Sequence, residues 1–191
     1  QMINEIDPTI DKKSKETTQV MDKIKELEYE GYQFEGAESS VRLLIRKELG
    51  RFKPFFTIAD FKTIGEKPVD GRALSASALV KVMVDGKEAV NAAEGDGPVN
   101  ALDKALRTAL EEFFPKIKEL RLTDFKVRVI DQGATASKVR VLIESTDGVD
   151  IWTNVGVSTD VIEASLIALV DSIEYKLLID MERQIKEYHL Y

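Results

Sequence analysis

The sequence predicts an α+β fold in which a strand-strand-strand-helix unit occurs twice, with the sheets packed on a central layer of helices. Apolar and polar residues alternate with period two in six short segments, which is typical of antiparallel strands with one buried face. Segments with the 3.6-residue period of a helix follow the third and the sixth of these strands. A helical hairpin is expected before both units.

The chain begins with a polar, charged segment. Residues 1–16 contain the breaker Asp7-Pro8 and are expected to form a flexible linker. Residues 17–50 are predicted to form the helical hairpin, whose first helix ends at Gly31 and whose second helix ends at Gly50. The hairpin has little core of its own, so we expect its apolar side to pack on another part of the protein. That side consists of Val20, Met21, Ile24, Leu27, Val41, Leu44, Ile45 and Leu49.

The first repeat covers about residues 55–115. Its second and third strands are joined by Asp85-Gly86, a dipeptide preferred by two-residue type I′ hairpin turns. The helix that follows starts at Pro98, because proline suits the first helical position, where its missing N–H would have no partner. Pro115 closes this helix.

The second repeat covers about residues 116–180. Residues 131–134 are predicted to turn the chain after its first strand, and Asp147-Gly148 is a second hairpin signal. A long helix follows from about residue 161. Asp160 and Glu163 precede and open it with the spacing of a capping box.

The two repeats match each other in the same structural order. Asp60-Phe61-Lys62 recurs 64 residues later as Asp124-Phe125-Lys126, and Asp85-Gly86 recurs 62 residues later as Asp147-Gly148. These nearly constant separations indicate a duplication, against the alternative of coincidence between generic amphipathic elements. A third match lies in the two long helices, where Ala101, Ala105 and Leu106 correspond to Ala164, Ala168 and Leu169.

The helix of the second repeat is apolar around nearly its whole circumference, which is typical of a helix buried on most sides. One sheet and one neighbouring helix cover only part of such a surface, so we predict a symmetric homodimer. The alternative is that the sheets curl around both helices within one chain. The apolar residues are Val161, Ile162, Ala164, Leu166, Ile167, Ala168, Leu169, Val170 and Ile173.

Composition excludes several classes of function. The formal net charge of −7 argues against nucleic acid or an anionic membrane as partner, and no apolar run is long enough to span a bilayer. The chain has no cysteine and a single histidine, His189, so we expect neither a catalytic residue nor a metal site. A free-standing carboxylate enzyme is a third alternative, but no clustered His, Cys or metal-ligand spacing supports it. The absence of cysteine and of a secretory signal fits a cytoplasmic protein.

The stretch Gly95-Asp96-Gly97-Pro98-Val99 is the most informative segment of the chain. Glycine before a helix-opening proline leaves the first helical amides uncovered, and these amides attract a phosphate or a carboxylate. An α-amino acid would fit if its ammonium paired with Asp96 and its side chain touched Val99, Val157 or Ile162. The alternative interpretation is an ordinary strand-to-helix turn with good capping.

Three segments resemble a known family. They are Glu-Leu-Glu-Tyr-Glu-Gly-Tyr-Gln-Phe-Glu-Gly-Ala-Glu at residues 26–38, Glu-Gly-Asp-Gly-Pro-Val-Asn-Ala at 94–101, and Gly-Val-Ser-Thr-Asp-Val-Ile-Glu-Ala-Ser at 156–165. They are similar to the C-terminal regulatory part of citramalate synthases, which belong with the 2-isopropylmalate and homocitrate synthases. The first segment favours the citramalate branch.

The resemblance implies a function that spacing alone does not. Such enzymes condense acetyl-CoA with an α-keto acid on an N-terminal, metal-dependent barrel, while their C-terminal domain dimerises and binds the end-product amino acid. No barrel pattern is present here, so the chain is expected to be a regulatory fragment that is inactive alone and holds no cofactor. Residues 51–191 would be the regulatory dimerisation domain, and isoleucine its feedback inhibitor.

By the same resemblance, the effector contacts map to the turn before the first long helix, the loop around Gly133, one strand of the second repeat and the start of its helix. Two alternatives are a leucine-sensing domain of a 2-isopropylmalate synthase and a purely structural dimerisation module. The implied effector-binding residues are Gly95, Asp96, Gly97, Pro98, Val99, Phe125, Val127, Ala134, Thr135, Val161 and Ile162.

Overall fold

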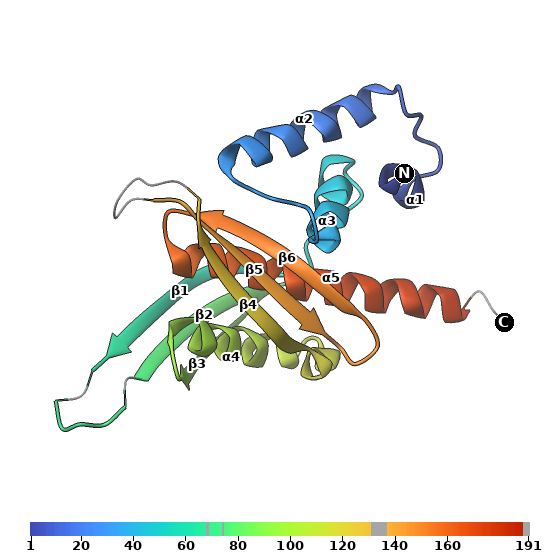
Figure 1. The fold of residues 1–191 in the computed structure, drawn as a ribbon. Helices are drawn as coiled ribbons and strands as arrows, with labels where there is room; N and C mark the ends of the chain where they lie inside the picture. The colour runs from blue at the N-terminus through green and yellow to red at the C-terminus, as the bar shows by residue number, and fades with distance from the viewer. Residues whose placement is uncertain (68, 74, 131–136, 189–191) are drawn as a thin grey trace. The chain divides into compact units, whose positions relative to one another are not determined.

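The computed structural model describes residues 1–67, 69–73, 75–130 and 137–188 (Figure 1). It confirms the α+β fold, because a three-stranded antiparallel sheet followed by a helix occurs twice. The chain divides into two compact units. The hairpin unit consists of Gln1–Lys53 with Leu122–Tyr175, and the α4 unit consists of Pro54–Arg121 with Lys176–Tyr191.

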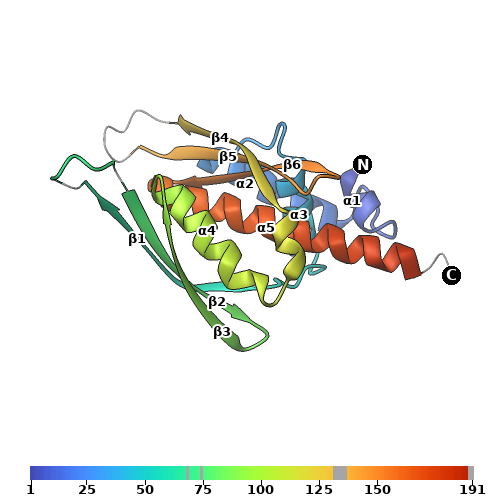
Figure 2. The same cartoon turned by 90° about the horizontal axis from the view of Figure 1, so that it is seen from below.

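The α4 unit contains the first sheet, in the order β1(Thr57–Glu66), β2(Ser75–Val84), β3(Lys87–Gly95). Helix α4(Pro98–Glu111) packs on β2 and β3, as Figure 2 shows. The alternation in the sequence explains this layer, because every second residue of β2 points to the helix and is buried. These residues are Ala76, Ala78, Val80, Val82 and Val84.

The turn between β2 and β3 confirms the type I′ prediction. Val84 pairs with Lys87, so only Asp85 and Gly86 lie between the strands, and both have positive φ, 46° and 79°. A positive φ at both central positions defines this turn and fixes the register of the hairpin.

The hairpin unit contains the second sheet, in the order β4(Arg121–Val129), β5(Val139–Thr146), β6(Ile151–Ser158). The hairpin expected at Asp147-Gly148 forms, but its loop has four residues, because Thr146 pairs with Ile151. The Asp147 Oδ1 accepts hydrogen bonds from the next backbone N–H groups, Val149 at 3.0 Å and Asp150 at 2.8 Å. This Asx turn makes a wider connection than the first hairpin has.

Three helices lie in the N-terminal part of the hairpin unit, α1(Met2–Ile6), α2(Lys15–Glu30) and α3(Glu38–Glu48). Helix α1 falls within the stretch expected to be a linker. Helix α2 ends at Gly31 as predicted, with a left-handed φ of 113°. Helix α3 packs on β6, and the Ser40 Oγ accepts a hydrogen bond of 3.0 Å from the backbone N–H of Val155, so the hairpin packs on another element as expected.

Helix α5(Val161–Tyr188) contributes its first half to the hairpin unit and its second half to the α4 unit. The apolar circumference predicted for it is largely buried within the single chain. The buried residues include Ala164, Leu166, Ala168, Leu169 and Ile173.

Several predictions fall on residues outside the described ones. These are the turn at residues 131–134, the implied effector contacts Ala134 and Thr135, and His189. Within the described ranges, no helix has both the length and the apolar character needed to cross a membrane.

Candidate functional site

The start of α4 is an open helix end. Gly97 is the N-cap residue and has extended backbone, so no side chain caps the helix, and Pro98 occupies the first helical position. Among the described residues, the backbone N–H groups of Val99 and Asn100 have no hydrogen-bond acceptor. Uncovered amides at the positive end of a helix dipole favour an anion.

Asp96 stands beside these amides and is exposed. Its backbone N–H donates a 3.3 Å hydrogen bond to the Asn100 Oδ1, which fixes the turn before the helix. Its carboxylate makes no ion pair or hydrogen bond with the part of the chain that the structure describes. A free carboxylate next to free amide donors is complementary to a molecule with an ammonium and a carboxylate group.

Gly95 is required by close packing and not by its φ. A Cβ at this position would lie 2.5 Å from the Ala101 nitrogen and 2.6 Å from the Asn100 Oδ1. Glycine therefore allows the end of β3 to approach the first turn of α4. Gly95 is part of the predicted motif, and this close approach is its physical role.

The start of α5 is a closed helix end. The Asp160 Oδ1 accepts hydrogen bonds from the backbone N–H groups of Ile162 at 2.7 Å and Glu163 at 3.1 Å. The reciprocal half of the capping box runs through Ser158, whose hydroxyl donates to the Glu163 carboxylate and accepts from the Asp160 N–H at 3.0 Å. The protein's own carboxylate thus occupies the anion position at this end.

The other implied contacts lie on the hairpin unit, whereas residues 95–99 lie on the α4 unit. Phe125 and Val127 are two residues apart on β4 and point to one face of it, 37% and 43% exposed. At the start of α5, Val161 is 39% exposed and Ile162 is half-buried. Because Asp160 already holds the amides of α5, these two residues offer apolar contact only.

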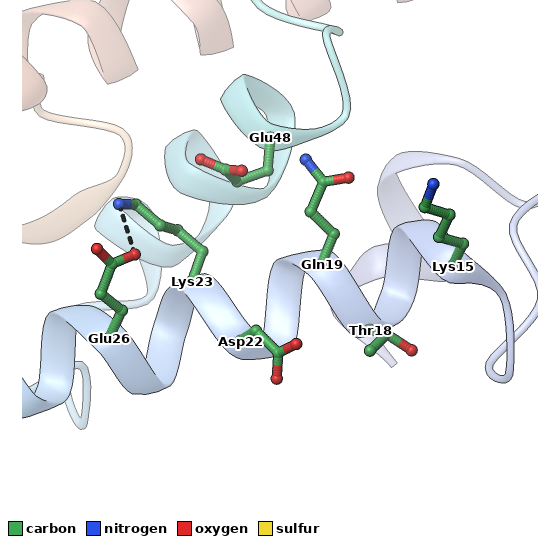
Figure 3. Close-up of a pocket in the computed structure, with 7 residues that line it drawn as sticks. All are labelled: Lys15, Thr18, Gln19, Asp22, Lys23, Glu26 and Glu48. Carbon is green, nitrogen blue, oxygen red and sulfur yellow. Dashed lines mark hydrogen bonds and ion pairs between the residues drawn. The ribbon is translucent and has the colours of Figure 1, made fainter.

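Two of the hollows in the hairpin unit are lined in part by α2, and neither contains an implied effector residue. A cavity of about 330 Å³ has apolar walls that include Leu27, Leu44 and Ile167. A polar groove between α2 and α3 contains the Lys23–Glu26 ion pair of 2.9 Å (Figure 3). The ion pairs Lys23–Glu26 in the groove and Lys47–Asp171 at the cavity are typical of structural contacts.

Two acids with little solvent exposure, one on each long helix, were not predicted from the sequence. In α4, burial raises the pKa of Asp103, and its ion pair with Arg107 opposes that shift. In α5, burial raises the pKa of Asp171, opposed by Lys47, whose Nζ lies 3.0 Å from its Oδ1. The Asp103–Arg107 spacing of four residues is a detectable helical signal, whereas Lys47 and Asp171 are too distant in the chain to be paired by pattern.

The burial of Lys176 was not predicted from the sequence either. Lys176 in α5 is fully buried, and its Nζ lies 2.9 Å from the Glu119 Oε2 and 2.8 Å from the Asp180 Oδ1. These acids offset the cost of burying the ammonium. Its i,i+4 spacing to Asp180 was the available sequence signal, although such pairs usually lie on exposed helix faces.

Comparison with known proteins gives a consistent set of similarities. The model of the LeuA allosteric (dimerisation) domain family matches residues 35–177. An (R)-citramalate synthase of Aquifex aeolicus is 52% identical over 177 residues, which are 92% of this chain and 34% of that protein. The (R)-citramalate synthase of Geobacter sulfurreducens is 50% identical over 169 residues, 88% of this chain and 32% of that protein.

A more distant similarity extends to a second kind of synthase. A 2-isopropylmalate synthase of Acidimicrobium ferrooxidans is 31% identical over 138 residues, 72% of this chain and 24% of that protein. The chain spans about a third of the length of the citramalate synthases that it matches.

Proposed function

Because the chain belongs to the LeuA allosteric (dimerisation) domain family, we propose that it is the regulatory part of a citramalate synthase-like acyltransferase. In this proposal it binds isoleucine, the end product, for feedback inhibition, and it joins two subunits. The condensation of acetyl-CoA with an α-keto acid is assigned to a metal-dependent catalytic barrel outside these 191 residues. The higher identity to citramalate synthases than to the 2-isopropylmalate synthase supports isoleucine over leucine.

The open start of α4 is the observation that carries the effector part of the proposal. The effector's carboxylate would accept hydrogen bonds from the free N–H groups of Val99 and Asn100. Its ammonium would pair with the free carboxylate of Asp96. Val99, which lies at the same helix start, would contact the aliphatic side chain.

Thermal unfolding of the 191-residue chain with added isoleucine, leucine or no ligand tests this function. A ligand that binds only the folded state at a hundred times its Kd adds about 2.7 kcal/mol to the free energy of unfolding, which is readily seen as a higher Tm. We expect isoleucine to raise the Tm. A response to leucine alone would assign the domain to leucine sensing, and no response to either would leave a structural dimerisation module.

The variant Asp96→Asn locates the site. It keeps the size of the side chain and removes the negative charge, so the isoleucine response should be lost while the Tm without ligand changes little. Asp85→Asn is a matched control, because it neutralises another acid of the α4 unit in a type I′ turn that accepts asparagine equally well. An unchanged isoleucine affinity in Asp96→Asn would refute the ammonium pairing.

We place the dimer interface on the exposed apolar face of β4, which is formed by Phe125, Val127 and Val129. Contiguous exposed apolar residues on a strand favour association with a partner. Sedimentation should give a dimer for the native chain and a monomer for Val127→Asp. The same charge placed at Val149, which lies 77% exposed in the β5–β6 loop, should leave the dimer intact. A dimer that survives Val127→Asp would move the interface elsewhere.

A further inference from the structure

We propose that the apolar cavity of the hairpin unit is a binding site for a small neutral aliphatic molecule that carries one oxygen acceptor, such as a ketone. Its lining comes from α2, the connection to α3, α3 itself, β6 and the first half of α5. All of these residues lie in Gln1–Lys53 or Leu122–Tyr175, so the cavity belongs to the hairpin unit alone. It contains none of the residues at the start of α4, and binding there does not require the proposed effector site.

The size and the walls of the cavity suit a small apolar molecule. Its volume of about 330 Å³ is at the lower end of the range of about 300–1,000 Å³ that is typical of ligand pockets. One wall is a stack of two aromatic rings, with centroids 5.7 Å apart. All but one of its large apolar side chains are only half-buried, so a molecule in the cavity would remove their remaining surface from water. These apolar residues are Leu27, Tyr32, Phe34, Leu44, Val155 (the buried one) and Ile167.

Ser40 gives the cavity an unused hydrogen-bond donor. Its side chain lines the cavity, it is 4% exposed, and its Oγ accepts hydrogen bonds from the Val155 N–H at 3.0 Å and the Asn154 Nδ2 at 3.3 Å. A hydroxyl can accept two hydrogen bonds and donate one, so its acceptor positions are both used. Its hydrogen has no acceptor among the residues that the structure describes. Because an unpaired buried donor is unfavourable, an oxygen atom in the cavity would supply the missing partner.

The charges in the lining favour a neutral molecule over an ion. The Lys47 Nζ lies 3.0 Å from the Asp171 Oδ1. The Lys23 Nζ lies 2.9 Å from the Glu26 Oε2. A carboxylate ligand would therefore find both ammonium groups of the lining already paired, and Glu48 would repel it. An ammonium ligand would be repelled by the two lysines and could not accept the free hydroxyl hydrogen.

Nuclear magnetic resonance of the 191-residue chain, titrated with methyl isobutyl ketone, tests the site. We expect saturable shifts that are largest at the amide signals of Leu44, Val155 and Ile167, with a Kd on the order of 1 mM for so small a ligand. Isocaproate and isoamylamine carry the same branched aliphatic end with a negative or a positive charge. Each should bind at least about tenfold more weakly than the ketone, because a charge would be desolvated without a free counterion.

A cavity-filling variant tests the location. Leu44→Trp should occupy the hollow, so it should weaken ketone binding at least about tenfold while the Tm without ligand is unchanged or higher. Met21→Trp is the matched control, because it enlarges an apolar residue of the same unit that is 45% exposed on α2 and outside the lining. It should bind the ketone like the native chain.

A second variant tests the hydrogen bond. Ser40→Ala removes the donor, so the ketone should bind about threefold or more weakly. Its Tm should also fall, because the Val155 N–H loses its acceptor, and binding is therefore measured at a temperature where the variant is folded. Native-like binding in Leu44→Trp or in folded Ser40→Ala, tighter binding of either ion, or no saturable shift in the native chain overturns the inference. None of these outcomes bears on the response to isoleucine at the start of α4.

Discussion

The starts of α4 and α5 occupy corresponding places in the two repeats, but they differ in what accepts the hydrogen bonds of their first backbone N–H groups. At α5, Asp160 accepts the free amides of the first turn, and Ser158 and Glu163 complete the cap. At α4, Gly97 supplies no acceptor, and Asp96 lies outside the helix with its carboxylate unpaired among the described residues. One helix end is satisfied by its own chain, whereas the N–H groups of Val99 and Asn100 at the other have no acceptor among the described residues.

Leaving the start of α4 without a side-chain cap costs little stability. Glycine at an N-cap is only a few tenths of a kcal/mol less favourable than serine or aspartate. The start of α5 is fully capped. The start of α4 lacks this small capping free energy and leaves its amides exposed. Four predictions test this contrast.

The largest effect is expected where strand and helix approach most closely. A Cβ on Gly156 would lie 2.1 Å from the Ala164 carbonyl oxygen, whereas the nearest atom to a Cβ on Gly95 is the Ala101 nitrogen at 2.5 Å. Gly156→Ala should cost about 3 kcal/mol or more, and Gly95→Ala about 2 kcal/mol, since both force backbone shifts. Urea unfolding measures both, and a smaller loss for Gly156→Ala would contradict the proposed tightness of the β6–α5 contact.

The second prediction concerns an N-cap carboxylate added to α4, like the one that Asp160 provides on α5. Gly97 has a backbone that any residue adopts, and a Cβ there meets nothing within 4 Å. Gly97→Asp should therefore cap α4, raise stability by a few tenths of a kcal/mol, and weaken isoleucine binding at least about tenfold through competition for the amides. Gly97→Ala adds the Cβ without the acceptor and should bind nearly normally. Calorimetry measures the Kd for isoleucine of both variants. Equal Kd values would exclude these amides from the site.

The third prediction removes the cap of α5. Asp160→Ala leaves the amides of Ile162 and Glu163 without their acceptor and should cost about 1 kcal/mol of unfolding free energy. Asp160→Asn should recover most of it, because asparagine caps equally well. The isoleucine affinity of both variants is expected to stay near the native value, and its loss would assign the α5 amides to the effector after all.

The smallest effect is a pH dependence shared by the two halves. Burial raises the pKa of Asp171 in α5 and of Asp103 in α4 above the ordinary value of 3.8. The folded chain then holds each proton more tightly than the unfolded chain, so the stability contributed is greatest at low pH and declines as pH rises through 3.8 to the raised pKa. Asparagine does not titrate. The stability of Asp171→Asn and of Asp103→Asn, relative to the native chain, should therefore increase from about pH 3 to about pH 7 in urea titrations.

Local patterns were enough for much of the fold. Asp85-Gly86 specified a type I′ turn, Gly31 ended a helix with positive φ, and Asp160 capped α5, each because one residue type suits one backbone geometry. The same dipeptide at Asp147-Gly148 forms a four-residue loop instead, because the Asp147 carboxylate accepts hydrogen bonds from the amides that follow it. Patterns of this kind predict that a turn occurs more reliably than its length.

The candidate site, too, was predictable from the sequence only in part. The sequence identified residues 95–99, because glycine, acid and proline before an amphipathic helix have consequences within one turn. It predicted the cap that Asp160 places on α5, but not the role of Ser158, which links the Asp160 N–H to the Glu163 carboxylate.

By itself, the sequence determined the repeat, its strand and helix order, and the open helix end at Gly97, because all of these depend on neighbours a few residues apart. Only the tertiary structure decided that Arg140 holds Gly31, that Lys47 pairs with Asp171, and that Gly156 is pressed against α5. Arg140 and Gly31, like Lys47 and Asp171, are more than a hundred residues apart in the chain. Contacts over such separations follow from how the elements pack, and no periodicity along the sequence encodes them.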